Sequence, residues 1–107
     1  MTYKYFFGSD KRSVPYLNFL SKEIKELVVV TTKPKKSGRG NILRTNPVEN
    51  FCQNNNIIFK YFDDSEIYSD MDYGVCVSFG AIFKADFING NAPIFNIHLS
   101  SLPELRG

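Results

Sequence analysis

The single histidine of the chain, His98, lies two residues after Asn96 at the end of an apolar segment. An asparagine amide is a neutral hydrogen-bond donor, and a histidine can donate or shuttle a proton near neutral pH. Residues i and i+2 of a strand point to the same side, so both side chains can face one bound group. This pair suits a group transfer that passes through a tetrahedral oxyanion, where one group stabilises negative charge and another moves a proton. An Asn-x-His pair at a strand end can equally be structural, and these two residues alone leave both interpretations open.

A second candidate site is the basic segment between residues 33 and 44. Its cations have no acidic residue between them, and two glycines flank the one at the tip: Lys33, Lys35, Lys36, Arg39 and Arg44. A flexible cationic loop is suited to contacts with phosphate groups. The alternative interpretation is a solvated surface loop.

An alternation of strand and helix patterns predicts the framework that positions these residues. Apolar and β-branched runs predict strands at 3–7, 27–32, 57–61, 73–78 and 93–97. Helical spacing predicts a first helix with Ser13 as its N-cap and Pro15 in its first turn. A second helix is expected to begin at Asn46-Pro47 and end at 54–56, and a short third one lies around 85–88. This order predicts an α/β fold with a Rossmann-like, mostly parallel sheet.

Three polar segments follow predicted strands of this sheet, at 8–10, 78–80 and 96–98. Ligands of such sheets bind at the carboxyl ends of the strands, near a switch in strand order. The sequence therefore predicts that these three segments meet at one ligand site.

Length and composition place the chain among globular proteins of one domain, spanning residues 1–107. Its formal net charge of +2 is too small to indicate nucleic-acid binding by itself. Cys52 and Cys76 have no metal-ligand spacing, so a reducing compartment is the default. No apolar run reaches the length that spans a membrane, and no signal or transit segment is visible before the first strand.

Four sequence blocks, in order and at compatible spacing, resemble the methionyl-tRNA formyltransferase family from about residue 3 to residue 107. Residues 6–10 with Ser13-Val14-Pro15 are similar to the opening strand and turn of that family, closest to its fungal mitochondrial members. Residues 35–40 with Asn46-Pro47-Val48 are similar to its basic Gly-Arg-Gly loop and the helix behind it. Residues 75–82 resemble its fourth strand and folate-pocket loop. Residues 96–98 and 100–103 resemble its catalytic pair and its Ser-Leu-Leu-Pro turn.

The resemblance implies the amino-terminal domain of an enzyme that transfers a formyl group from 10-formyltetrahydrofolate to the amine of initiator methionyl-tRNA, without a metal. Asn96 and His98 would be two members of an Asn-His-Asp catalytic set. The resemblance implies folate contacts for eight residues: Phe79, Gly80, Ala81, Ile82, Ser100, Ser101, Leu102 and Pro103. It implies tRNA contacts for Lys35, Lys36 and Arg39. It also suggests a mitochondrial location, with the cytoplasm as the alternative.

The chain departs from the family in ways that lead to further expectations. The catalytic Asp and the carboxy-terminal β-rich domain of the family have no counterpart in these 107 residues, and Leu99 and Ser101 replace residues of other types. We therefore expect a domain that is incomplete at its C-terminal end, has an unpaired sheet edge and is complemented by a separate C-terminal half. One alternative is an inactive truncated relative or gene remnant that binds folate or RNA weakly. Another is a formyltransferase that acts on a sugar nucleotide or a purine-pathway amine.

Overall fold

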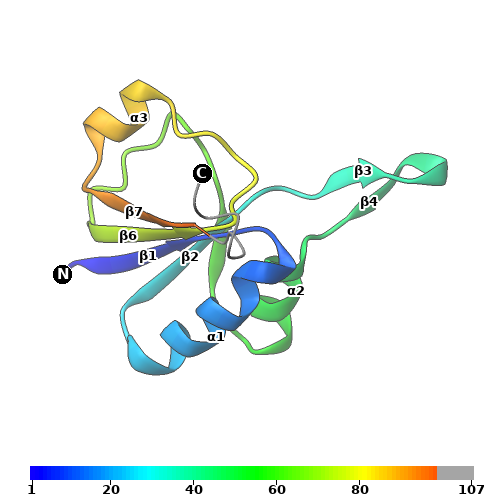
Figure 1. Cartoon of the computed structure of the whole chain (residues 1–107), viewed down its shortest axis with the longest axis horizontal. Helices are drawn as coiled ribbons and strands as arrows, with labels where there is room; N and C mark the ends of the chain where they lie inside the picture. The colour runs from blue at the N-terminus through cyan, green and yellow to red at the C-terminus, as the bar shows by residue number, and fades with distance from the viewer. Residues whose placement is uncertain (99–107) are drawn as a thin grey trace, which may run out of the picture.

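A five-stranded parallel sheet forms the centre of the computed structural model, which describes residues 1–98 apart from the side chain of Ser37 (Figure 1). The sheet has the order β5-β2-β1-β6-β7. Its strands are β1 (Tyr3–Phe7), β2 (Leu27–Thr31), β5 (Phe59–Tyr61), β6 (Met71–Val77) and β7 (Ile94–Ile97). All four pairings are parallel. The structure confirms the predicted α/β class and Rossmann-like sheet.

Three helices cover the two faces of this sheet. α1 (Val14–Glu23) and α2 (Pro47–Asn54) lie on one face, and α3 (Ala85–Gly90) lies on the other (Figure 1). Asn46 caps α2, because its side chain accepts a hydrogen bond from the Glu49 amide, and Pro47 occupies the first turn, as predicted.

Alternation along β1 divides the core into two layers. Phe6 packs toward α1 and α2 with aliphatic partners such as Val29 and Leu17. Tyr5 and Phe7 point to the opposite face, where they pack with Phe87 of α3. Successive side chains of a strand point to opposite faces, so this one aromatic strand supplies both layers.

The chain adds strands to one side of β1 first and then to its other side, so the strand order changes between β1 and β6. From β1 the chain moves outward through β2 to β5, and it then returns to the other side of β1 to form β6 and β7. The carboxyl ends of β1 and β6 therefore meet at a topological switch point, where open α/β sheets bind ligands. β5 and β7 are the two edges of the sheet within the described residues, and Phe95 on β7 is 60% exposed.

Three local predictions are corrected by the structure. Ser13 does not cap α1, because its hydroxyl donates a hydrogen bond to the Val77 carbonyl instead. The basic segment is an antiparallel hairpin of β3 (Lys35–Ser37) and β4 (Ile42–Arg44) rather than an irregular loop. The bounds of two predicted strands also differ: the third begins two residues late, at Phe59, where the preceding Ile58 is 87% exposed, and the fourth begins two residues early, at Met71.

None of the helices in residues 1–98 is both long and apolar enough to cross a membrane.

Candidate functional site

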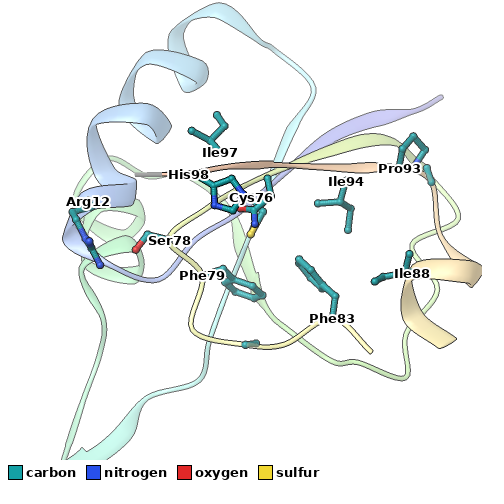
Figure 2. A pocket seen from close by; sticks show the side chains of 13 residues that line it. Arg12, Cys76, Ser78, Phe79, Phe83, Ile88, Pro93, Ile94, Ile97 and His98 are labelled. Atoms are coloured by element: carbon teal, nitrogen blue, oxygen red, sulfur yellow. The ribbon is translucent and has the colours of Figure 1, made fainter. Parts of the chain in front are cut away.

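A cavity of about 520 Å³ lies against the α3-facing side of β6 and β7 and reaches their carboxyl ends (Figure 2). Cys76 and Ser78 line it from β6 and the residue after it. One part of the wall is apolar and includes Phe79, Phe83 and Ile94. Its volume, and its combination of an apolar wall with a few polar groups, are typical of a small-molecule site.

Hydrogen bonds between distant segments build the polar end of this cavity. The Ser9 amide donates to the Ser78 carbonyl at 3.2 Å, and the Gly80 amide donates to the Ser9 hydroxyl at 2.7 Å. The Ser78 hydroxyl donates to Asp10 Oδ2 at 3.0 Å. The prediction that residues 8–10 and 78–80 meet at one sheet edge is confirmed.

Gly8 allows the chain to pass close to Ser13 at this point. A Cβ atom at position 8 would lie 2.8 Å from Cε2 of Phe6 and 2.9 Å from the Ser13 hydroxyl oxygen. The Ser13 hydroxyl in turn lies 2.6 Å from the Val77 carbonyl oxygen, to which it donates, and it accepts from the Asp10 amide at 3.2 Å. The first turn after β1 is thereby attached to the end of β6.

Asn96 and His98 both line the cavity, from the end of β7. Asn96 pairs with Cys76 across the β6–β7 ladder, so its side chain lies on the same face of the sheet as the Cys76 thiol. His98, Ser78 and Cys76 all line this cavity, and in the view of Figure 2 His98 overlaps Cys76. An amide donor and an imidazole therefore line the same cavity, and their catalytic roles stay predictions.

The Cys76 side chain forms part of the cavity floor but is not a nucleophile at neutral pH. It is 6% exposed, and burial raises the pKa of its thiol to about 11. The thiolate is the reactive form, so this side chain contributes shape rather than covalent chemistry.

Stacked phenylalanine rings form the apolar wall. The Phe79 and Phe83 rings are stacked with centroids 5.6 Å apart, and Phe83 stacks on Phe87 at 5.3 Å. Phe7 lies behind them, with edge-to-face contacts to Phe79 and Phe83. Such a wall favours a flat, conjugated ligand, because aromatic rings pair well in stacked or edge-to-face geometry.

Comparison with known proteins identifies relatives of this chain. No family model matches the chain. The methionyl-tRNA formyltransferase of Elusimicrobium minutum is 32% identical over 109 residues, and that of Thermosipho africanus is 32% identical over 112 residues. That of Mycoplasma pneumoniae is 35% identical over 111 residues, and each match covers 95% of this chain. The chain is a homologue of the methionyl-tRNA formyltransferases. It spans about a third of the length of these relatives, from 33% to 36%.

The predicted folate loop of this formyltransferase homologue divides between two cavities. Phe79 and Ala81 line the cavity that contains Asn96 and His98. Gly80 and Ile82 line a neighbouring cavity, which Ala81 also lines, and Ile82 is 81% exposed. The other predicted folate contacts, Ser100, Ser101, Leu102 and Pro103, lie outside the described residues, so their role stays a prediction.

The predicted tRNA-binding residues of the homologue lie on the β3–β4 hairpin, which projects beyond the carboxyl edge of the sheet (Figure 1). Lys35, Lys36 and Arg39 are exposed, and within residues 1–98 none of them forms an ion pair. Gly38 and Gly40 adopt positive φ angles of 68° and 79°, which side chains disfavour, so the glycines allow the tight tip. The hairpin does not contribute to the cavity of Asn96 and His98.

Sequence reasoning missed Arg12, which lines the cavity. Its Nε donates to Asp10 Oδ2 at 2.7 Å. The available signal was its place directly after the Gly8-Ser9-Asp10 turn, which already marked the end of β1 as a site.

In the described part of the chain, no three His, Cys, Asp or Glu side chains are grouped as metal ligands would be.

Proposed function

We propose that this chain forms the formyl-transfer site of a methionyl-tRNA formyltransferase. The reaction moves a formyl group from 10-formyltetrahydrofolate to the amine of methionyl initiator tRNA. The observation that carries this proposal is the placement of Asn96 and His98 in one aromatic-walled cavity at the end of the sheet. Relatives of that name, 32–35% identical over nearly the whole chain, support the same conclusion.

The proposed chemistry needs charge stabilisation and one proton transfer. The methionine nitrogen forms a bond to the formyl carbon, and the bond from that carbon to N10 of the folate then breaks. A proton leaves the attacking amine, and N10 gains one. We assign the Asn96 amide to the developing oxyanion and the His98 imidazole to the proton transfer, since both face the cavity.

The formyl donor fits the apolar half of the cavity. Its flat rings match the stacked Phe79 and Phe83 side chains, and a cavity of about 520 Å³ lies within the range of small-molecule sites. We propose Ala81 as a further wall residue, with Gly80 and Ile82 as contacts for a part of the donor that extends into the neighbouring cavity. Residues 100–103 are proposed to complete the donor contacts.

The hairpin is proposed to bind the tRNA. Lys35, Lys36 and Arg39 are exposed cations that the described residues leave without ion pairs, and such cations contribute most of the affinity for a phosphate backbone. Because the hairpin lies apart from the cavity, it would contact a part of the tRNA that is distant from the reacting amine.

Full activity is proposed to require polypeptide beyond this chain, because the chain spans about a third of the relatives. A separate C-terminal half is the proposed partner, and mitochondria are the proposed location, with the cytoplasm as the alternative. Fluorescent tagging in the native cells distinguishes the two compartments.

A chimera tests the catalytic assignment. The matching segment of the Thermosipho africanus relative is replaced by this chain, and formylation of methionyl-tRNA is measured. We expect the chimera to be active and His98→Ala or Asn96→Ala to lower kcat/KM by about 100-fold or more.

Asn89→Ala is the matched control, because Asn89 is exposed on α3 and does not line the cavity. Full turnover by the His98→Ala chimera would contradict the assignment. A chimera that is folded but does not bind 10-formyltetrahydrofolate would favour the inactive alternative.

A further inference from the structure

Arg12 is the one cation that lines the cavity of Asn96 and His98 within the described residues. It follows β1 in a short 3-10 helix, Lys11–Ser13, whose first residues carry it to the cavity rim. Its side chain is 62% exposed, so it remains accessible to a ligand. Neither the proposed chemistry nor the proposed tRNA contacts of the hairpin use this residue.

Asp10 orients the Arg12 side chain but pairs with only one of its nitrogens, Nε. The ion pair joins Nε of Arg12 to Asp10 Oδ2, and the described residues provide no hydrogen-bond partner for the two terminal nitrogens. A guanidinium carries five N–H donors in a planar fork that matches the geometry of phosphate and carboxylate oxygens. As far as the described residues go, the donors of the terminal nitrogens are therefore free for an anion.

The carboxylate that orients Arg12 is itself held on other sides. Asp10 accepts hydrogen bonds from the Lys11 amide at 2.8 Å and from the Ser78 hydroxyl at 3.0 Å. The bond from Arg12, followed by that from Lys11, lowers the pKa of Asp10 below its usual value, so the side chain stays ionised. Asp10 thus joins the Arg12 side chain to the end of β6.

Arg12 lies at the opposite end of the cavity from the apolar residues. Figure 2 shows it on the far side of His98 from Phe83, Ile88 and Pro93. If the rings of the formyl donor occupy the aromatic end, the other substrate must approach His98 from the Arg12 end. The nearest anionic group that an aminoacyl-tRNA carries to its reactive amine is the phosphate of its terminal nucleotide.

We infer that Arg12, oriented by Asp10, binds the phosphate of the terminal nucleotide of the aminoacyl acceptor and so contributes to its recognition. Asp10 acts here as a positioning residue. The inference rests on the proposed function, since it requires that the cavity accept both a formyl donor and an aminoacyl-nucleotide.

A ligand pair isolates the contribution of the phosphate. The probe is 3′-methionylamino-3′-deoxyadenosine, a stable amide, with and without a 5′-phosphate, titrated into the ¹⁵N-labelled 107-residue chain and followed by NMR. We expect the phosphate to tighten binding about tenfold in the wild type and less than about twofold in Arg12→Gln, because a charge-assisted hydrogen bond is lost. Lys11→Gln is the matched control. It removes the same charge from the neighbouring residue, and the Lys11 side chain does not line the cavity.

Two further variants and a second ligand pair complete the test. Arg12→Lys and Asp10→Asn should retain part of the phosphate effect, because both keep a cation at position 12. Arg12→Lys loses the planar fork of donors, and Asp10→Asn loses the ion pair that orients Arg12. The second ligand pair is 10-formylfolate and 10-formylpteroate, which differ by the glutamyl group.

Four outcomes are decisive. Loss of the phosphate effect in Arg12→Gln but not in Lys11→Gln supports the inference. An unchanged phosphate effect in Arg12→Gln overturns it, as does an Arg12 dependence of the glutamate effect alone, which would assign the residue to the formyl donor. Failure of the folded wild-type chain to bind either ligand pair would overturn the proposed function together with the inference.

Discussion

The cavity and the β3–β4 hairpin are both candidate substrate-binding regions, but they are built in opposite ways. The cavity depends on hydrogen bonds between residues 64 to 71 positions apart, such as that from Ser13 to Val77 and that from Gly80 to Ser9. The hairpin depends on pairs between adjacent segments, such as Lys35 with Arg44. The cavity therefore exists only when the whole sheet is formed, whereas the chemistry of the hairpin lies in exposed side chains that the core does not need.

The largest expected difference in the free energy of unfolding is between the variants Phe7→Ala and Leu43→Ala. Phe7 is fully buried behind the cavity wall, and its removal should lower the free energy of unfolding by about 3–5 kcal/mol. Leu43 in the hairpin is 62% exposed, and its replacement should change stability by less than about 0.5 kcal/mol. Urea denaturation measures both. Similar losses of unfolding free energy in the two variants would show that the hairpin contributes to the core as much as the cavity wall does.

The next effect concerns the hydrogen bonds that join β1 to β6. Ser13→Ala leaves the Val77 carbonyl and the Asp10 amide without this partner, which should cost about 1–3 kcal/mol of unfolding free energy. Ser21→Ala is the control, because the Ser21 hydroxyl makes only a local, exposed bond to the Asn18 carbonyl. Equal unfolding midpoints for the two variants would show that the long-range bond contributes no stability.

A pH titration tests the buried thiol at the cavity floor. The pKa of Cys76 is raised from 9.0 to about 11 in the folded chain, so the folded state keeps the proton that the unfolded state releases. Stability from this group is complete below pH 9 and is lost as the pH rises toward 11. Its contribution to the slope is up to about −1.4 kcal/mol per pH unit in that window.

Cys76→Ala should remove that contribution from the slope of unfolding free energy against pH. Cys52→Ala provides the comparison within the α1 and α2 layer, since burial also raises the pKa of Cys52 to about 11. An unchanged alkaline slope in Cys76→Ala would show that the thiol is not shielded by the fold.

The smallest effect on stability is expected in the hairpin. Replacing Lys36 and Arg39 by Gln should change the unfolding free energy by less than about 0.5 kcal/mol, because both side chains are exposed. It should weaken tRNA binding and reduce the dependence of affinity on salt by about one unit for each lost phosphate contact. Lys22 and Lys25, which are exposed on and after α1, provide a double control with the same change in charge. An equal reduction in the control would show that net charge, rather than the hairpin, attracts tRNA.

Local patterns in the sequence were sufficient for the order and type of the main elements. The aromatic run 3–7 forms β1, and the Asn46-Pro47 pair begins α2, because strand runs and helix caps are encoded within a few neighbouring residues. The meeting of residues 8–10 with 78–80 could also be predicted, since parallel strands place their carboxyl ends at one edge. The exposure of the cations at 35, 36 and 39 could likewise be predicted, since they lie in a basic segment with glycines.

Only the tertiary structure decided where individual side chains point at that edge. Ser13 has the sequence context of a helix cap, yet its hydroxyl bonds to Val77, which lies 64 residues away in the chain. Arg12 lines the cavity because Asp10, held by Ser78, orients it. Gly80 and Ile82 line a second cavity, whereas Phe79 lines only the first and Ala81 lines both. The physical reason is that periodicity and capping are local properties, whereas a side chain's direction depends on partners that only the folded sheet brings within hydrogen-bonding distance.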